Sequence, residues 1–299
     1  MGISAVICTR NRHETIGRAV QSVLNNDYPD FDLTVVDQSD TDLTWAALKE
    51  VAGQDGRLHY IHTSRAGLSA AYNLGIANSQ HELLAFTDDD CVAPPHWLQN
   101  IEQAFERAQN CDLLYGQVLA PAELDGAAGV LPTLAISRRA IIDRRSHFRV
   151  FGMGANFAAR RELFRAVGPF DEVLGGGGAL RSSQDFDLAF RVYRAGRSIL
   201  LEPDVTVDHY GLRSDVDWPK TMTAYGIGDG GFYMKHVRCG DLLAARLLTA
   251  CLIGQTVRSV VKPLIGRPHA TEYLRGVLRG MADSFGFGLD RGRRLYLAR

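Results

Sequence analysis

The chain has 299 residues, of which 46% are hydrophobic, so it is long enough to bury a full core in one large domain or two smaller ones. Its 33 basic and 34 acidic residues nearly cancel, and this balance argues against nucleic acid as a partner. Five cysteines stand singly with no Cys-x-x-Cys pair, which excludes a zinc framework or a disulfide lattice and indicates a reducing compartment. We expect a cytoplasmic protein, because no basic leader with a long apolar core precedes the first strand.

The first third of the chain alternates strand and helix patterns. Strands are predicted over residues 3–8, 33–36, 58–61 and 83–87, and helices over residues 16–24, 43–51 and 68–77. Repeated strand–helix units with short connections predict a parallel, doubly wound sheet. Ligands of such sheets bind at the carboxyl ends of the strands, where Asp37 and the run Asp88-Asp89-Asp90 fall.

The middle of the chain is less regular. Residues 121–132 predict a loop, and four glycines at 175–178 predict a mobile loop ahead of Gln184-Asp185-Phe186-Asp187. A helix follows and ends at Gly196. Arginines cluster between residues 138 and 149; a solvated face is the usual explanation, and a groove for phosphate or an anionic acceptor is the alternative.

Three consecutive aspartates at the end of an apolar strand repel one another, and folding alone rarely requires them. Clustered carboxylate oxygens suit Mg²⁺ or Mn²⁺, ions that also bind substrate phosphates. The alternative is that Asp90 caps a helix over residues 95–108, which accounts for one aspartate and leaves two unexplained. We therefore expect a metal site here.

Six segments, taken in chain order, resemble the motifs of family 2 glycosyltransferases of the GT-A type. They are VICTRNR at 6–12, VVDQSD at 35–40, AGLSAAYNLG at 66–75, FTDDD at 86–90, the pair GANFA with GPFDE at 154–158 and 168–172, and QDFDL at 184–188. Each match is weak, but their common order across residues 3–210 is specific. The resemblance implies an α/β, Rossmann-like nucleotide-diphospho-sugar transferase fold. We expect a catalytic domain over 1–215, with a nucleotide-binding half over 1–118 and an acceptor half over 119–215, and a mainly helical region over 216–299.

The resemblance also implies an inverting transfer of sugar from a nucleoside diphosphate to an acceptor hydroxyl, in the synthesis of a polysaccharide, glycolipid or other glycoconjugate. Asp185 is the expected general base, while Asp187 is expected to be structural; a plain helix-start aspartate is the alternative for Asp185. Asp88 and Asp90 are the expected metal ligands, and His209 is either a third ligand or a half-buried structural histidine. Residues expected to bind the donor nucleotide are Thr9, Arg10, Asn11, Arg12, Asp37, Gln38, Arg65, Gly67, Asn73, Asp88 and Asp89.

Three departures from the family pattern concern the donor and the base. Gln38 stands where the family often has an aspartate that contacts uracil, and this replacement leaves the nucleobase open. A UDP-sugar is still favoured, and a GDP- or dTDP-sugar is the alternative. Gln184 replaces an acidic residue before the base, and Tyr72 replaces an arginine. The competing functions are a metal-dependent nucleotidyltransferase and a non-catalytic module that binds sugar nucleotides.

The C-terminal region combines apolar stretches with an excess of basic residues. The uncharged run between Arg246 and Arg258 is about half of the roughly 20 residues that span a bilayer. We expect peripheral association with the inner face of the membrane and a lipid-linked acceptor; a helical subdomain packed on the core, or a homodimer interface, is the alternative. The basic residues are Arg246, Arg258, Lys262, Arg267, Arg275, Arg279, Arg291, Arg293, Arg294 and Arg299.

Overall fold

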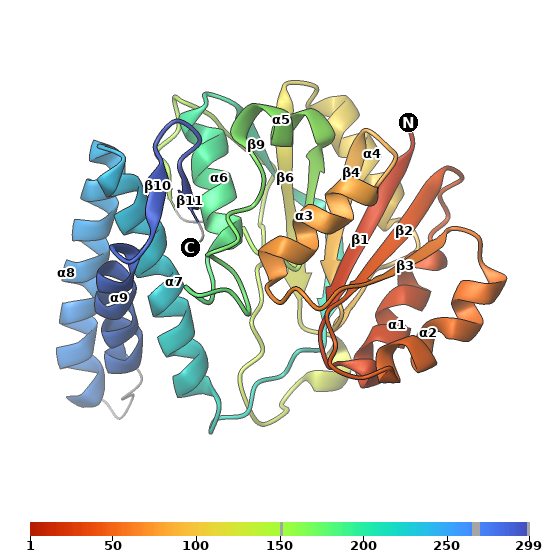
Figure 1. Ribbon diagram of the computed structural model, residues 1–299, viewed down its shortest axis with the longest axis horizontal. Helices are drawn as coiled ribbons and strands as arrows, with labels where there is room; N and C mark the ends of the chain where they lie inside the picture. The colour runs from red at the N-terminus through yellow and green to blue at the C-terminus, as the bar shows by residue number, and fades with distance from the viewer. Residues whose placement is uncertain (150–151, 265–269, 298–299) are drawn as a thin grey trace.

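The computed structural model describes residues 1–149, 152–264 and 270–297. A central sheet is covered by helices on both faces, and a group of helices stands beside it at the C-terminal side (Figure 1). Within the described residues the sheet has nine strands in the order β3-β2-β1-β4-β8-β6-β9-β5, with β7 paired to β9. Arg267 and Arg299 of the predicted basic surface lie outside the described residues, as does the side chain of Lys262.

The first third of the chain forms the predicted parallel half of the sheet. Strands β1, β2 and β4 are buried along nearly their whole length, as strands covered on both faces are, and β1 pairs in parallel with β2 and β4. The elements are β1 (Ile3–Thr9), α1 (His13–Leu24), β2 (Phe31–Asp37), α2 (Leu43–Gln54), β3 (Leu58–His62), α3 (Leu68–Asn78) and β4 (Leu83–Asp88). The parallel α/β prediction is confirmed for this part of the chain.

The middle of the chain makes the sheet mixed. The strand β8 lies between β4 and β6 and runs antiparallel to both, which sequence spacing did not predict. The elements are β5 (Cys91–Val92), α4 (Trp97–Arg107), β6 (Cys111–Leu119), the 3₁₀ turn η1 (Ala122–Leu124), β7 (Ala140–Ile142), β8 (Asn156–Arg160), α5 (Arg161–Val167), α6 (Gln184–Arg194) and β9 (Ser198–His209). Short β5 pairs with the end of β9 and so places His209 opposite Cys91, next to the aspartate run.

The alternative interpretation, that Asp90 caps the helix after it, is wrong. The helix α4 begins at Trp97 and its N-cap position is His96, with no side-chain cap bond. Asp90 lies six residues earlier, where its carboxylate contacts Arg12 and His209 instead.

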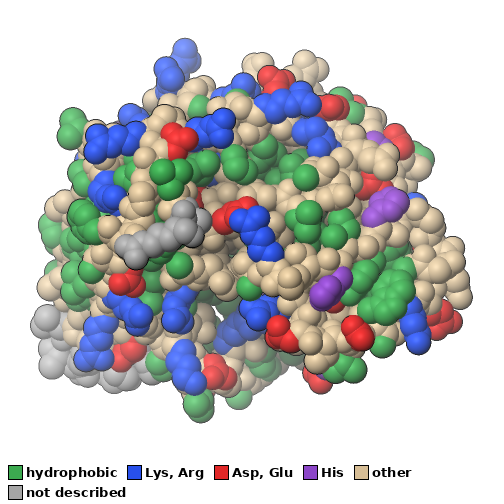
Figure 2. Space-filling model, in the orientation of Figure 1, with side chains coloured by type: hydrophobic (Ala, Val, Ile, Leu, Met, Phe, Trp, Pro, Cys, Tyr) green, Lys and Arg blue, Asp and Glu red, His purple; other side chains and the backbone are tan. Residues whose placement is uncertain are grey.

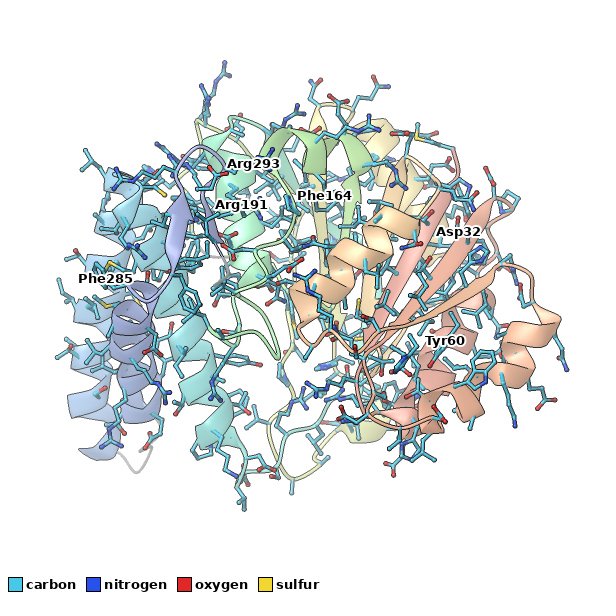
Figure 3. All side chains as sticks on the ribbon, in the orientation of Figure 1. Asp32, Tyr60, Phe164, Arg191, Phe285 and Arg293 are labelled. Atoms are coloured by element: carbon cyan, nitrogen blue, oxygen red, sulfur yellow. The ribbon has the colours of Figure 1, made fainter. Side chains whose placement is uncertain are left out.

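The C-terminal region consists of three long helices and a hairpin. These are α7 (Trp218–Arg238), α8 (Leu242–Leu264), α9 (Ala270–Ser284) and the strands β10 (Gly288–Asp290) and β11 (Leu295–Leu297). The hairpin, which the sequence did not predict, folds back towards α6, so that Arg293 lies near Arg191 and Phe164 (Figure 3). Among the described residues, no helix has both the length and the apolar content that crossing a membrane requires.

A buried ion-pair network joins the helical region to the sheet. Lys235 of α7 is fully buried, and its Nζ lies 2.6 Å from Asp171 and 2.7 Å from Asp187 of α6. Asp187 also accepts hydrogen bonds from Arg191 at 2.8 Å and from His236 Nε2 at 2.8 Å. Because each charge has an oppositely charged partner, the burial of this group is tolerated.

Glycines bring α7 and α9 into backbone contact. A Cβ on Gly226 or Gly230 of α7 would overlap the backbone of Tyr273 or Val277, and a Cβ on Gly280 of α9 would overlap the carbonyl of Ile227. The spacing of four residues places these glycines on one face of each helix. The two helices therefore cross with no side chain between them.

Replacing Gly280 with alanine tests this packing. The added methyl group meets backbone rather than a flexible side chain, so we expect overpacking to cost about 1–3 kcal/mol and to lower the melting temperature by several degrees. The matched control is Gly254→Ala in α8, where no atom lies within 4 Å, and where alanine should stabilise the helix by about 0.5–1 kcal/mol. Equal melting temperatures for the two variants in calorimetry would contradict the packing described.

Candidate active site

Two adjoining pockets lie at the carboxyl end of β4. The first, here called the arginine pocket, has a volume of about 390 Å³ and contains Arg10, Arg12 and Arg213. The second, here called the tyrosine pocket, has a volume of about 360 Å³ and contains Tyr72, Tyr225 and Tyr273. Leu68 and Asp88 line both, so the pockets meet at these two side chains. In the space-filling view the surface is hollowed between the helical region and the strand–helix region, with basic side chains beside the hollow (Figure 2).

The aspartate run is held by contacts from β1 and from the loop after it. Thr9 Oγ1 donates to Asp89 at 2.6 Å, and Arg12 contacts Asp89 at 3.0 Å. The same Arg12 guanidinium reaches Asp90. One arginine thus contacts two of the three carboxylates.

Asp88 has no such partner among the described residues. Burial, followed by the charges of Asp90 and Asp89, raises its pKa to about 7. Burial opposes ionisation of Asp90 too, but the hydrogen bond from His209 and the charge of Arg12 lower its pKa well below the usual range. At neutral pH Asp90 is an anion, whereas Asp88 is partly protonated and gains most from an added positive charge.

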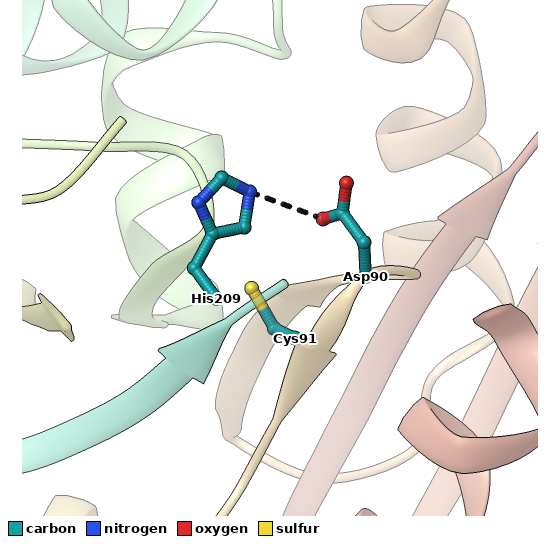
Figure 4. A group of neighbouring side chains, drawn as sticks. All are labelled: Asp90, Cys91 and His209. Carbon is teal, nitrogen blue, oxygen red and sulfur yellow. Dashed lines mark ion pairs between the residues drawn. The ribbon is translucent and has the colours of Figure 1, made fainter. Parts of the chain in front are cut away.

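The donor atoms beside Asp90 suit a divalent cation only in part. Ligand atoms of Asp90, Cys91 and His209 lie within 4.8 Å of one another, and His209 Nε2 faces Asp90 at 3.3 Å (Figure 4). His209 Nδ1 lies 2.8 Å from the carbonyl of Pro132, which orients the ring and leaves Nε2 towards Asp90. Burial raises the pKa of Cys91, so a thiolate is disfavoured there, and Mg²⁺ and Mn²⁺ prefer oxygen or imidazole ligands. Asp90 and His209 therefore suit such an ion, and Cys91 does not.

Asp185 lies in the wall of the tyrosine pocket, in the first turn of α6. Its two carboxylate oxygens accept one backbone hydrogen bond each, from Gly154 at 2.9 Å and from Phe186 at 2.9 Å. Burial raises its pKa to about 6, and no cation lies within ion-pair distance among the described residues. A carboxylate with an elevated pKa and free lone pairs can accept a proton from a group bound in the pocket.

Seven of the predicted donor-binding residues line the arginine pocket, and four do not. Those in the lining are Thr9, Arg10, Arg12, Gln38, Gly67, Asp88 and Asp89. Gln38 donates its side-chain amide to the carbonyls of Arg65 and Gly67, which holds the turn before α3 in place. Gly176 and Gly177 complete the floor, where a Cβ on Gly177 would lie 3.3 Å from Gly67.

The other four predicted residues support the pocket from outside its lining. Asp37 is fully buried, and its oxygens accept bonds from Ser39 N–H at 2.8 Å and Tyr60 OH at 2.6 Å. Asn11 adopts a left-handed conformation and bonds to Asp40. Arg65 and Asn73 both contact Glu172. In this structure these side chains shape loops next to the pocket.

Several residues of the two pockets were not predicted. Arg213 follows His209 by four residues in a loop, and no pattern marks it; among the described residues it has no ion-pair partner. Tyr225, Asp229 and Tyr273 come from the C-terminal helices. The arginine cluster at 138–149 lines neither pocket, and Arg139 pairs with the buried Glu202 at 2.7 Å.

The two aspartates of α6 predict opposite effects on stability. The raised pKa of Asp185 means that its ionisation destabilises the fold as pH rises from about 4 through 6. Asp185→Asn should therefore be more stable than the wild type at pH 8, by on the order of 1–3 kcal/mol. This gain in stability should vanish near pH 4. The pKa of Asp187 is lowered, so its charge stabilises the fold above about pH 4, and Asp187→Asn should lower the melting temperature at pH 8. Thermal denaturation at several pH values measures both. A destabilised Asp185→Asn at pH 8 would contradict the unpaired burial of this carboxylate.

The sequence of this chain is similar to those of known glycosyltransferases. The family model described as glycosyl transferase family 2 matches residues 4–168. A putative colanic acid biosynthesis glycosyl transferase of Escherichia coli K12 is 28% identical over 249 residues, which cover 78% of this chain and 81% of that protein. A glycosyltransferase of Nostoc is 27% identical over 177 residues, which cover 58% of this chain and about half, 55%, of the relative.

Solved structures show the same fold at low identity. A mannosyltransferase from Pyrobaculum calidifontis in complex with GDP-Man and Mn²⁺ superposes with a TM-score of 0.65 at 16% identity, covering 94% of this chain and 87% of that one. TarS of S. aureus in complex with UDP-GlcNAc gives a TM-score of 0.62 at 15% identity, covering 94% of this chain and 82% of the TarS chain. The GT-A fold that the motifs implied is therefore confirmed. Since the family model matches more than half of the sequence, this chain belongs to glycosyl transferase family 2.

Proposed function

We propose that the protein is an inverting glycosyltransferase that moves a sugar from a nucleoside diphosphate to an acceptor hydroxyl. The observation that carries the proposal is the meeting of the two pockets at Asp88. One pocket offers arginines for a diphosphate, and the other offers the unpaired carboxylate of Asp185 for an acceptor hydroxyl. The mannosyltransferase and TarS structures, which hold GDP-Man and UDP-GlcNAc, support a nucleotide-sugar donor.

The departing diphosphate requires positive charge, and the arginine pocket supplies it. Arg213 is half-buried and unpaired among the described residues, so its guanidinium can contact phosphate oxygens without breaking an existing ion pair. Arg12 lies next to the aspartates and balances their charge. Asp90 and His209, with Asp88 in the same pocket, would hold Mg²⁺ or Mn²⁺, which as a Lewis acid supplies further charge neutralisation to the diphosphate.

The acceptor hydroxyl loses its proton to Asp185. Backbone N–H groups of Gly154 and Phe186 fix the carboxylate, and each oxygen keeps a lone pair for the incoming hydroxyl. Because donor and acceptor approach the shared wall at Asp88 from opposite pockets, attack opposite the leaving diphosphate inverts the anomeric centre. Among donors we favour a UDP-sugar, with Gln38, Gly67 and Thr9 on the nucleotide side, and a GDP- or dTDP-sugar as the alternative.

Two variants test this division of roles. Asp185→Asn keeps the shape and, through its amide oxygen, one of the two backbone hydrogen bonds, but it cannot accept a proton, so transfer should fall by roughly 10²-fold or more while donor binding stays within about twofold. Asp90→Ala should lose transfer by roughly 10²–10³-fold, because a preorganised charge contact is lost, and EDTA should abolish wild-type turnover. Transfer is followed by release of nucleoside diphosphate across a panel of nucleotide sugars.

The control is Asp125→Asn, an exposed aspartate outside both pockets, which should behave as wild type. A wild-type protein that binds nucleotide sugars without any turnover would favour a non-catalytic binding module. Full transfer by Asp185→Asn would place the base elsewhere.

We also propose that α8 contacts the inner face of the membrane and brings the site near a lipid-linked acceptor. Leu242, Ile253 and Val257 are exposed on α8, at 85%, 61% and 56%, and Arg246 and Arg258 are exposed beside them. An apolar stripe bordered by cations favours an anionic lipid surface, to which each basic residue contributes about 1 kcal/mol.

Flotation with vesicles tests the membrane contact. Wild-type protein should float with phosphatidylglycerol vesicles at low salt and be released by high salt, and the double change Ile253→Glu with Val257→Glu should abolish flotation. Leu43→Glu, at a leucine of α2 that is 51% exposed, is the matched control and should float normally. Protein that never floats would instead favour a dimer interface or a soluble acceptor.

A further inference from the structure

The tyrosine pocket carries a second buried carboxylate that the catalytic proposal does not use. Asp229 of α7 accepts a hydrogen bond from Ser183 at 2.6 Å on one oxygen and from Tyr273 of α9 on the other. Among the described residues it has no ion-pair partner. Each oxygen can accept a further hydrogen bond, so Asp229 can still bind a hydroxyl in the pocket.

The C-terminal helices are built to hold this carboxylate in place. Glycines precede and follow Asp229, and a Cβ on Gly228 would overlap Ser182, so α7 approaches the start of α6 closely. The glycine contacts between α7 and α9 bring Tyr273 within reach of Asp229. The positions of the Tyr273 hydroxyl and of the Asp229 carboxylate therefore both depend on the close packing of α7 and α9.

Charge separates the two pockets. Among the described residues, the lining of the tyrosine pocket contains three aspartates, Asp88, Asp185 and Asp229, and no lysine, arginine or histidine. The arginine pocket contains three arginines. An anionic group placed beside Asp185 and Asp229 would face like charges with no counter-ion, whereas a hydroxyl can donate to both carboxylates.

Resting on the proposed function, we propose that Asp229 and Tyr273 form an acceptor subsite that takes a neutral sugar unit by its hydroxyls and rejects acidic sugars. Aromatic and aliphatic side chains, including Tyr225, Phe186 and Met153, give the apolar walls that small-molecule pockets use beside a few polar groups. The volume of about 360 Å³ suits a single sugar unit. Asp229 is a specificity residue here, and Asp185 remains the base.

Matched glycosides test the charge preference. Methyl glucoside and methyl galactoside are compared with the corresponding methyl uronides, which differ by one carboxylate, in saturation-transfer NMR with the full chain, UDP and Mg²⁺. The neutral glycosides should bind at millimolar concentration, and the uronides should bind at least tenfold more weakly. Equal binding of both classes, or no binding of a neutral glycoside, would overturn the proposal.

Two variants test the residues. Asp229→Asn should weaken the binding of neutral glycosides about tenfold and reduce the difference in affinity between neutral glycosides and uronides. Tyr273→Phe should show a smaller loss of affinity for neutral glycosides. The melting temperatures of both variants show whether they fold. The control is Asp215→Asn, an exposed aspartate before α7.

The outcomes separate the two proposals. If wild-type protein neither binds nor hydrolyses any nucleotide sugar, the proposed function fails. If donor turnover is normal while Asp229→Asn and Tyr273→Phe bind both glycoside classes as wild type does, the acceptor subsite alone is wrong.

Discussion

The buried contact between Lys235 and the two aspartates, Asp171 and Asp187, is the constraint on which the rest of the structure depends. Lys235 belongs to α7, Asp187 to α6, and Asp171 to the loop after α5, so one ammonium group joins three segments that are distant in sequence. Asp171 also accepts the backbone N–H of Tyr296 at 2.8 Å, which attaches the C-terminal hairpin. Among the described residues Asp171 has no ion-pair partner besides Lys235, so removing Lys235 would leave Asp171 as an unpaired buried charge.

This network fixes the reactive side of α6. Asp185 and Asp187 stand in the same helical turn but face different surroundings, one a pocket without cations and the other a core with Lys235, Arg191 and His236. Burial therefore raises the pKa of Asp185. Asp187 is also buried, but its own cationic neighbours lower its pKa. The ion pairs of Asp187 anchor the helix that holds Asp185, an unpaired carboxylate whose burial is unfavourable by itself.

The C-terminal helices both pack against one another and contribute residues to the tyrosine pocket. Glycines let α7 and α9 touch through their backbones, and the same contact brings Tyr273 to Asp229 in the tyrosine pocket. The pocket opposite the arginines is thus completed by residues beyond the stretch that the family model matches, which ends at residue 168. Differences between relatives in these helices would change the tyrosine pocket and leave the aspartate run and its arginines in place.

The sequence by itself determined the parallel half of the sheet, because apolar strands and amphipathic helices have periods that can be read locally. It also placed Thr9, Arg12 and the aspartate run at one sheet edge, since carboxyl ends of parallel strands meet there. Only the tertiary structure decided the features that depend on contacts between residues distant in sequence. Antiparallel β8 was inserted beside β4, the glycines of α7 and α9 were paired, and Arg213 and Asp229 were brought into pockets that no local pattern announces. Asp37 and Asn73 show the converse: their motifs are recognisable, but neighbouring side chains turn them towards loops outside the pocket lining.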